Sequence, residues 1–336
     1  MNAVKQSNSP IDFLLIGGGF FGYAKEITRA LESRGRTVAW FEDRPALDTF
    51  TKATIRLAPA LIAAKAERYV DSLIAKMHEQ PVRDVLVIKG EALSPASIRR
   101  LRAALPNARF TLYFWDSYRN MPKDSQEKVS HFDKAFTFDP KDADADHRLI
   151  YRPLFFIDEY AHLQPVKCDI DLLFFGTVHS DRYTVLRRLA RNLPPEVRLE
   201  EVLYFPSNLV YAARRTFDPR FWRAHRDEFI FKPLSKIEVQ SLISRARAVV
   251  DIERAVQCGL TMRTIEMLGA GKKLVTTNRR IADADFFNPR NVAIIDRRRP
   301  IVTAEFLSLA YEPAAADLLK RYSLSGWLDE VVPTQD

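Results

Sequence analysis

The sequence predicts an α/β protein built from two doubly wound domains, and three observations support this. Short buried-strand patterns alternate with helical patterns in both halves, which is typical of parallel sheets covered by helices on both faces. The 336 residues suffice for two domains of ~100–200 residues, each with its own core. The shares of hydrophobic residues (47%) and charged residues (28%) are those of a globular protein. We place the domains at residues 1–165 and 166–310, followed by a helical tail at 311–336.

The first domain is expected to alternate strands and helices along its length. Proline disrupts a helix interior, so the helical stretch over 51–79 is expected to break at Pro59. Ser94 is a good cap and Pro95 suits the first helical position, so a helix starts there. From 155 to 167 the periodicity is lost, which marks the expected linker. Strands are expected at 12–16, 37–41, 84–88, 109–114, 135–138 and 149–151, and a helix at 23–33.

The second domain repeats this alternation. Ser235 followed by Glu238 forms a capping box, which predicts a helix over 235–245. The aromatic and basic region 206–229 receives no assignment. Strands are expected at 171–175, 248–252 and 292–295, a turn at Gly176-Thr177, and helices at 181–193, 305–311 and 314–321.

Residues 259–278 carry the most specific pattern in the chain: a glycine-led turn, one helix ending in glycine and a buried strand. A helix N-terminus has unpaired N–H groups and a partial positive charge, which suit a phosphate. One turn further in, Glu266 can accept hydrogen bonds from a ribose diol. The layout suits a nucleotide diphosphate, and an ordinary helix capped by Gly271 is the structural alternative. The residues expected to bind the nucleotide are Gly259, Leu260, Thr261, Met262, Arg263 and Glu266.

The same stretch resembles the donor-nucleotide motif of GT-B glycosyltransferases. Gly-Leu-Thr-Met-Arg before Glu266 and Lys-Lys-Leu-Val-Thr-Thr-Asn after the helix look most like the bacterial capsule and lipopolysaccharide biosynthesis branch, related to the spore-maturation-type enzymes. The resemblance is specific over 249–295. It implies two Rossmann-like domains facing a cleft and tail helices that return to the first domain. Arg263 departs from the motif, where smaller or apolar residues are common; it replaces another phosphate ligand or indicates an unusual donor, such as a CMP-activated acid sugar.

The resemblance also implies an activity. A nucleotide-activated sugar would be the donor and part of a surface glycan, free or on a lipid carrier, the acceptor. Neither a metal nor a bound cofactor is implied, because the protein itself stabilises the departing diphosphate in this fold.

By the same resemblance, two further loops of the second domain face the donor. Thr177 would donate a hydroxyl and Arg182 a charge-assisted hydrogen bond to the diphosphate, and a plain helix cap is the alternative. His179 is a candidate general acid or base, or an exposed loop histidine. Lys232 precedes the helix that starts at 235 and lies in the loop expected to read the base. Its side chain would reach a phosphate, and a plain turn into the helix is the alternative.

The acceptor side is expected on the first domain, where residues 115–120 follow a strand. Open α/β sheets bind ligands at the carboxyl ends of their strands. Asp116 is therefore the first candidate for a general base, and Glu42, after the second strand, is another. Trp115 and Tyr118 would stack on sugar rings. An Asx turn at Asp116 is the structural alternative.

The loop Gly17–Gly22 matches the dinucleotide fingerprint G-x-G-x-x-G, with an acidic residue, Glu42 or Asp43, about the expected ~20 residues further on. This favours an NAD(P)-dependent oxidoreductase as an alternative, although bulky Phe20 and Phe21 stand where a pyrophosphate must approach. In the glycosyltransferase interpretation, the loop instead lines the cleft and the acceptor through Gly18, Gly19 and Phe20. A non-catalytic sugar-nucleotide binder is a further alternative.

The formal net charge of +8 favours anionic partners such as nucleotides or an anionic membrane surface. No nucleic-acid-binding module accompanies it, so nucleic acid is not an expected partner. The six histidines lack ligand spacing, and the string Asp142, Asp144 and Asp146 is expected to form a polar loop rather than a magnesium site.

Cysteine content and hydropathy predict the compartment. Cys168 and Cys258 are far apart and form no metal pattern, and no apolar run is long enough for a bilayer span or a secretory core. We therefore expect a reduced, cytoplasmic protein. Its basic clusters suit peripheral work at the inner face of the cytoplasmic membrane.

Overall fold

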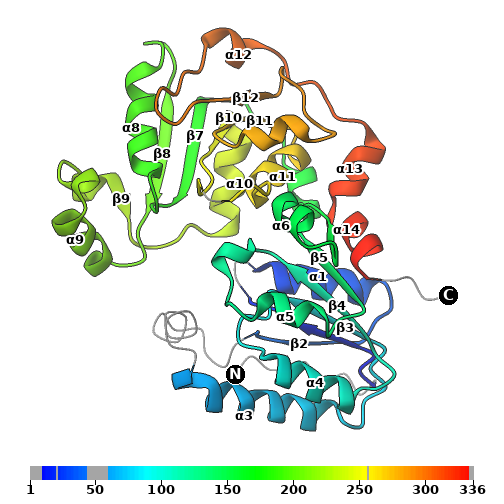
Figure 1. Ribbon diagram of the computed structural model, residues 1–336. Coiled ribbons are helices and arrows are strands. Elements are labelled where there is room, and N and C mark those ends of the chain that lie inside the picture. The colour runs from blue at the N-terminus through cyan, green and yellow to red at the C-terminus, as the bar shows by residue number, and fades with distance from the viewer. Residues whose placement is uncertain (1–9, 20–21, 44–59, 256, 333–336) are drawn as a thin grey trace. The chain divides into compact units, whose positions relative to one another are not determined.

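The computed structural model describes residues 10–19, 22–43, 60–255 and 257–332 (Figure 1). The chain divides into two compact units, one of residues 1–154 with 324–336 and one of residues 155–323. Each unit contains a six-stranded, all-parallel sheet. The expected fold class, two doubly wound α/β domains, is confirmed.

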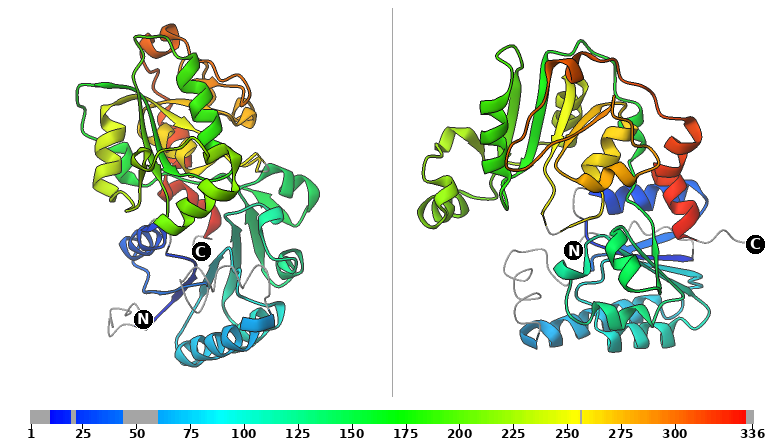
Figure 2. Two further views of the ribbon diagram at one scale, coloured as in Figure 1. Left: turned by 90° about the vertical axis from the view of Figure 1, so that its left-hand side faces the viewer. Right: turned by 45° about the horizontal axis from the view of Figure 1, so that its top comes forward.

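The first sheet has the strand order β2-β1-β3-β4-β5-β6. Its direction of winding reverses between β1 and β3, which makes the carboxyl ends of these two strands the switch point of the sheet. In Figures 1 and 2, α3 and α4 lie on one face of the sheet, and α1 and α14 lie on the other. The strands are β1 (Phe13–Ile16), β2 (Val38–Phe41), β3 (Asp84–Ile88), β4 (Arg109–Phe114), β5 (Lys134–Thr137) and β6 (Leu149–Tyr151); the helices are α1 (Tyr23–Ser33), α3 (Ala60–Met77), α4 (Pro95–Ala104), η2 (Tyr118–Asn120), α5 (Ser125–Val129), α6 (Pro140–Ala145) and α14 (Leu324–Val331).

The C-terminal helix α14 packs into the first unit through Trp327. This side chain is fully buried, and its ring meets that of Tyr113 edge-on at 4.8 Å between centroids. Burying an aromatic side chain of this size stabilises the packed state by about 1.5–3 kcal/mol. The chain from Leu324 onward therefore belongs to the unit that contains the N-terminal strands, whereas α13 belongs to the second unit.

The second sheet has the strand order β12-β11-β10-β7-β8-β9. Its switch point lies between β7 and β10, because the chain winds toward β9 first and toward β12 afterwards. The strands are β7 (Ile170–Thr177), β8 (Leu199–Tyr204), β9 (Phe229–Ile230), β10 (Ala246–Asp251), β11 (Lys273–Thr276) and β12 (Val292–Ile294); the helices are α7 (Asp158–Ala161), α8 (Arg182–Asn192), α9 (Asn208–Phe217), η3 (Pro219–Phe221), η4 (Arg226–Glu228), α10 (Lys236–Arg245), α11 (Met262–Gly269), η5 (Arg279–Asp283), α12 (Ala304–Ser308) and α13 (Ala316–Tyr322).

The second unit begins at Phe155, before the expected boundary at 165, because Phe156 packs against α11. A side chain on Gly269 would overlap the Phe156 ring, so the close approach requires glycine. The Phe156 amide also donates to the carbonyl of Tyr322 at 2.9 Å. The expected linker thus contains α7 and forms part of the second core.

Most predicted elements are confirmed within a residue or two, including the capping box of Ser235 and Glu238. Two predictions need correction. Gly176-Thr177 ends strand β7 instead of forming a turn, and Asp142 and Asp144 lie in helix α6 instead of a loop. Region 206–229, left unassigned, contains α9, η3, η4 and the start of β9. The expected break at Pro59 lies outside the described residues.

Candidate functional site

The switch point of the second sheet is bridged by one arginine. Arg182, the first residue of α8, donates from Nε to the carbonyl of Ile252 at 2.7 Å and from Nη1 to the carbonyl of Thr177 at 3.1 Å. These carbonyls follow β10 and end β7, so the guanidinium ties together the two strand ends that flank the switch point. Burial, and next the charge of Arg263, lower the pKa of Arg182 to about 10.

A second arginine lies beside the first. Arg263, in the first turn of α11, lies over the ring of Phe175 at 3.8 Å from its centroid. A Cβ on Gly176 would stand 3.6 Å from Nη2 of Arg263 and 3.7 Å from Nη1 of Arg182. Gly176 therefore lies beside both guanidinium groups, which are neighbours at this end of the sheet. Among the described residues, nothing accepts a hydrogen bond from the buried Nε of Arg263.

The electrostatic effect of these arginines is visible at His179. Burial first, and then the charges of Arg182, Arg254 and Arg214, lower the pKa of His179 to about 3. The imidazole is therefore neutral at pH 7, and the surroundings disfavour the imidazolium that a general acid requires. The field that repels a proton here attracts an anion, so this end of the sheet is suited to a phosphate.

The start of α11 is held by the side chain of Asp251. Thr261 caps the helix, accepting from the amide of Thr264 at 3.2 Å, and its hydroxyl donates to Asp251 at 2.5 Å. The hydroxyl of Thr264 donates to the same carboxylate at 3.1 Å. Since the Thr261 hydroxyl already serves the cap and Asp251, its side chain positions the helix start. Thr261 can therefore bind the donor nucleotide, as predicted, only through its backbone.

Glu266 lies buried in the second turn of α11 and hydrogen-bonds Tyr160 of α7. Burial, and next the charge of Glu266, raise the pKa of the Tyr160 phenol well above its ordinary value. The phenol therefore remains a hydrogen-bond donor that fixes the carboxylate. Tyr160 was not among the predicted site residues, because it lies in the stretch interpreted as a linker.

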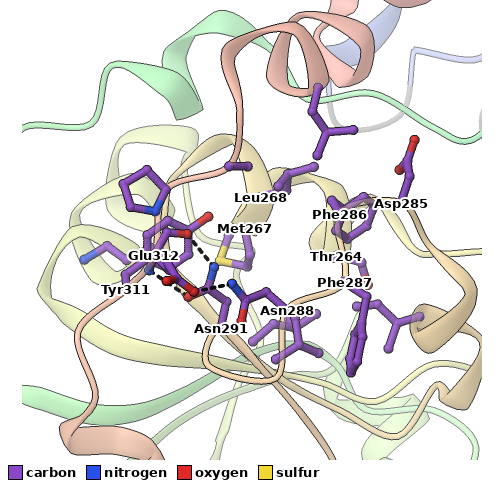
Figure 3. A pocket seen from close by; sticks show the side chains of 17 residues that line it. Thr264, Met267, Leu268, Asp285, Phe286, Phe287, Asn288, Asn291, Tyr311 and Glu312 are labelled. Atoms are coloured by element: carbon purple, nitrogen blue, oxygen red, sulfur yellow. Dashed lines mark hydrogen bonds between the residues drawn. The ribbon is translucent and has the colours of Figure 1, made fainter.

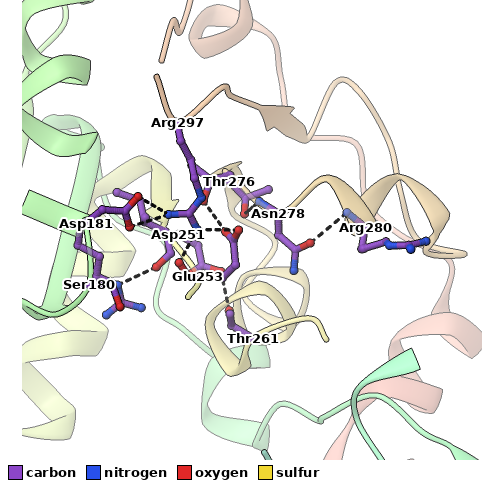
Figure 4. A network of polar contacts seen from close by, with 12 residues as sticks. Ser180, Asp181, Asp251, Glu253, Thr261, Thr276, Asn278, Arg280 and Arg297 are labelled. Atoms are coloured by element: carbon purple, nitrogen blue, oxygen red, sulfur yellow. Dashed lines mark hydrogen bonds and ion pairs between the residues drawn. The ribbon is translucent and has the colours of Figure 1, made fainter. Parts of the chain in front are cut away.

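A polar network joins the loops on both sides of this site (Figure 4). Arg297 pairs with Asp181 at 2.8 Å and with the buried carboxylate of Glu253 at 2.7 Å, and Glu253 also accepts a hydrogen bond from Thr277. Arg297 belongs to a run of three arginines, 297–299, and has a structural partner on each side. It holds the loop after β10 close to the start of α8.

Of the other predicted donor residues, Lys232 is exposed and follows edge strand β9. Strand β8 separates β9 from β7, so the structure does not bring Lys232 to the arginine pair. Leu260 is buried, and Gly259 accepts from the side chain of Asn278 at 3.1 Å through its carbonyl. These contacts hold the turn before α11.

The switch point of the first sheet carries a different set of charges. Lys89, directly after β3, pairs with Asp116 at 3.0 Å and with Glu91 at 3.5 Å. Its φ of 68° is left-handed, a conformation that a non-glycine residue adopts at a cost of about 1–2 kcal/mol. Asp116 also accepts from the side chain of Asn120 at 3.0 Å. The structure thus brings the predicted Asp116 to a lysine that sequence analysis missed.

The glycine-rich loop after β1 is filled by protein side chains. The amide of Gly19 donates to the carboxylate of Glu42 at 3.0 Å, and Trp40 donates from its ring nitrogen to the carbonyl of Gly17 at 2.9 Å. Gly18 is buried, and Phe20 lies outside the described residues. The Gly19 amide, which a dinucleotide pyrophosphate would need as a hydrogen-bond donor, is therefore already bonded to a carboxylate. This opposes NAD(P) binding at this loop.

The aromatic residues predicted to stack on sugars have ring partners within the first unit. Trp115 is buried, with ring centroids of Tyr23 and Tyr113 at 5.5 and 6.1 Å. Tyr118 meets Phe114 edge-on at 5.2 Å and donates its hydroxyl to Asp146 at 3.1 Å. These two rings are held within the first unit.

Comparisons with known proteins bear on this arrangement. No protein-family model matches the sequence, and no curated protein matches it significantly. Solved structures do match: a glycosyltransferase from Rickettsia africae ESF-5 (12% identity, 96% of this chain and 97% of that chain, TM-score 0.61) and Anabaena Alr3699/HepE in complex with UDP and glucose (10%, 96% and 98%, 0.60). UDP-GlcNAc 2-epimerase from Neisseria meningitidis bound to UDP-GlcNAc also matches (10%, 96% and 98%, 0.57). The chain has the GT-B fold.

Within this GT-B fold, the second unit also contains a cavity of about 190 Å³ beside α11 (Figure 3). Met267, Leu268 and Phe286 give it apolar walls, and its amides are engaged within the protein: the Asn291 side chain donates to the carbonyl of Glu312 at 2.6 Å. Neither Arg182 nor Arg263 lines it. The cavity is thus distinct from the arginine pair.

Two classes of site were also sought across the described ranges. No group of three or more histidine, cysteine, aspartate or glutamate side chains there can hold a metal ion. In the same part of the chain, no helix combines the length and the apolar character needed to cross a bilayer.

Proposed function

We propose that the chain is a glycosyltransferase that moves a sugar from a nucleotide diphosphate donor to a surface-glycan acceptor without a metal. The observation that carries this proposal is the arginine pair at the switch point of the second sheet. Arg182 and Arg263 lie side by side next to Gly176, and no carboxylate forms an ion pair with either among the described residues. Two neighbouring cations of this kind favour an anion.

The chemistry follows from the charge that develops during transfer. As the bond between the sugar carbon and the diphosphate oxygen breaks, negative charge grows on the diphosphate. Arg182, Arg263 and the free amides at the start of α11 meet it with charge-assisted hydrogen bonds and a partial positive charge. This stabilisation takes the role that a divalent cation has in other transferases.

Glu266 would hold the ribose diol of the same nucleotide. Its carboxylate lies one turn behind Arg263 on α11, and the hydrogen bond with Tyr160 fixes its orientation. Support for a uridine nucleotide comes from two solved structures of this fold, whose bound molecules are UDP with glucose and UDP-GlcNAc. We therefore place UDP-sugars first among the donors to be tested.

On the first unit, Asp116 would act as the base toward the acceptor hydroxyl, with Lys89 orienting it. Glu42 is the weaker candidate, because its carboxylate is already hydrogen-bonded to the Gly19 amide. The acceptor would be part of a capsule, lipopolysaccharide or exopolysaccharide glycan, free or on a lipid carrier. The excess of basic residues suits such anionic partners.

A thermal-shift panel of UDP, GDP, dTDP, CDP, CMP, NAD⁺ and NADP⁺ tests the proposal. Ligand at ~100 times its dissociation constant adds about 2.7 kcal/mol of stability, which is readily measured. We expect a shift with one sugar-carrier nucleotide that is lost in Arg263→Gln and reduced in Glu266→Ala. Arg279→Gln, which removes an exposed arginine, should retain the full shift and serves as the matched control.

Two outcomes would contradict the proposal. A shift with NAD⁺ or NADP⁺ alone, unchanged in Arg263→Gln, would favour an oxidoreductase. Conversion of a UDP-sugar to its epimer without transfer to any acceptor would favour a sugar-nucleotide epimerase, which one structure of this fold is.

A further inference from the structure

Helix α9 in the second unit turns an apolar face to solvent. Leu209, Ala212, Ala213, Thr216 and Phe217 follow the helical spacing of one face, and all are exposed. Leu209 is 82% exposed and Phe217 83% exposed, the highest values among the large apolar residues of the described chain. The buried side of the helix carries Tyr211 instead. The usual orientation of an amphipathic surface helix is therefore reversed.

The segment after α9 carries an exposed tryptophan. Trp222 follows η3 and is 60% exposed, whereas Phe221 beside it is buried. Arg215 of α9 donates to the carbonyl of Trp222 at 2.7 Å, which ties the tryptophan to the helix. We use the name apolar face for the exposed large apolar residues of this whole segment, which are Leu209, Val210, Phe217 and Trp222. In Figures 1 and 2, α9 stands out from the sheet of the second unit.

The same segment is rich in basic side chains. Arg214 and Arg220 are neutralised by Asp218, with ion pairs of 3.0 and 2.7 Å. Arg215, Arg223 and Arg226 have no carboxylate within ion-pair distance among the described residues, and they leave a positive excess over the exposed Asp227. Exposed leucine, phenylalanine and tryptophan on one segment with unneutralised arginines is the composition of a segment that lies in the interface of an anionic bilayer.

The same segment contacts the loop that carries His179. Arg220 donates to the carbonyl of Ser180 at 2.6 Å, and Ser180 has a left-handed φ of 54°. Arg214 is one of the charges that lower the pKa of His179. The segment that carries the apolar face is thus fastened to the loop at the carboxyl end of β7, where the arginine pair lies.

We propose that the apolar face docks the protein on the surface of an anionic phospholipid bilayer, with Phe217 and Trp222 at the depth of the headgroups and the arginines against lipid phosphates. The charge decides between this occupant and a second copy of the chain, because an isologous contact would bring the unneutralised arginines of both copies together. The inference adds a partner to the proposed function without depending on the nucleotide site. Docking would hold that site close to an acceptor carried by a lipid.

Vesicle binding tests the proposal, with Trp222 as its reporter. The other tryptophans of the described chain are buried or partly buried, so Trp222 should dominate the change in emission. We expect the full chain to bind vesicles of phosphatidylcholine with phosphatidylglycerol, with blue-shifted emission quenched by brominated lipid. Binding to phosphatidylcholine alone, or in high salt, should be much weaker, because the charge interaction is screened.

The discriminating variant is Leu209→Ser with Phe217→Ser, which keeps the reporter and all arginines. Losing two exposed apolar anchors should weaken vesicle binding about tenfold or more. Val166→Ser, at another exposed apolar site, before the amino end of β7, is the control and should bind like the wild type. All three proteins should show the same nucleotide-induced thermal shift, which separates this test from that of the proposed function.

The proposal is overturned if wild type does not bind anionic vesicles in low salt, or binds them equally in the double variant. It is also overturned if the wild type forms a dimer that the double variant does not form while neither binds vesicles, since the face would then cover a second copy.

Discussion

Both sheets have a switch point in their strand order, but the charged side chains at the two switch points are arranged differently. At the switch point of the second sheet, Arg182 and Arg263 stand side by side without carboxylate partners among the described residues. At the switch point of the first sheet, Lys89 is matched by Asp116 and Glu91. An unmatched pair of cations favours a diphosphate, whereas a lysine paired with two carboxylates favours a neutral polyol that both donates and accepts hydrogen bonds. Under the proposed function, this difference would assign the donor to the second unit and the acceptor to the first.

Replacing both arginines tests this comparison with the largest expected effect. Arg182→Met with Arg263→Met removes both charge-assisted interactions with the leaving diphosphate, so kcat/KM should fall about 10³-fold or more. Steady-state kinetics with the nucleotide sugar identified by the thermal-shift panel measures the loss. Arg279→Met, which removes an exposed arginine, should change kcat/KM less than about twofold. Equal activity in the double variant would mean that the charge asymmetry has no catalytic role.

The acceptor side should respond differently to Asp116→Asn. The amide keeps the size of the side chain but cannot take a proton, so kcat should fall about 10²-fold or more while donor binding is unchanged. Kinetics and nucleotide thermal shifts on the same preparation separate these two quantities. Asp144→Asn, an exposed site on α6, is the control. A weakened donor shift in Asp116→Asn would contradict the division of roles between the units.

Sequence patterns predicted the fold well because both sheets are buried on their two faces. Strands β1 and β3 are entirely buried, so they read as continuous apolar runs with glycine or polar residues at their ends. Strand β9 has only two residues and lies at an edge, and α9 turns its apolar face outward, so neither leaves the usual pattern. Region 206–229, which received no assignment, contains α9 and the start of β9.

The site was predicted only in part, because pairing across loops is not written in local sequence. Asp116 and Arg263 were chosen from their positions after a strand and at a helix start, and the structure brings each to a cation, Lys89 and Arg182. Thr261 was chosen by the same rule, yet its hydroxyl serves Asp251. Partners that arrive from other loops, such as Tyr160, become visible only once the chain is folded.

The ion pairs of Lys89 with Asp116 and Glu91 can be tested by measuring the stability of a Lys89 variant. Lys89→Met removes the cation between Asp116 and the buried Glu91. We expect the free energy of unfolding to fall by about 2–3 kcal/mol. This figure includes a partial offset, because the variant no longer has to hold a lysine side chain in one conformation. Urea unfolding measures the change. Lys134→Met, at an exposed position starting β5, should change stability by no more than about 0.5 kcal/mol. Equal losses in the two variants would show that Lys89 is an ordinary surface lysine.

A smaller effect is expected at the proposed ribose site. Tyr160→Phe removes one hydrogen bond to Glu266, worth about 1 kcal/mol, so KM for the donor should rise about fivefold with little change in kcat. Tyr311→Phe, which alters the separate cavity beside α11, is the matched control and should leave KM unchanged. A fall in kcat at constant KM would place Tyr160 in the chemical step instead.

The smallest effect is a change in the pH dependence of stability that only the second unit should show. The folded state lowers the pKa of His179 from an unfolded value of 6.5 to about 3, so the unfolded state binds a proton first as the pH falls. Stability is therefore complete above pH 6.5 and declines progressively from there toward about pH 3. Between about pH 7 and pH 6, wild type should lose under about 1 kcal/mol more than His179→Gln, measured by urea unfolding at each pH. A bound diphosphate should shrink this difference, because its charge offsets the field of the arginines and returns the pKa of His179 toward its ordinary value. An equal slope in the two proteins would mean that the positive field is weaker than the geometry of Arg182, Arg254 and Arg214 indicates.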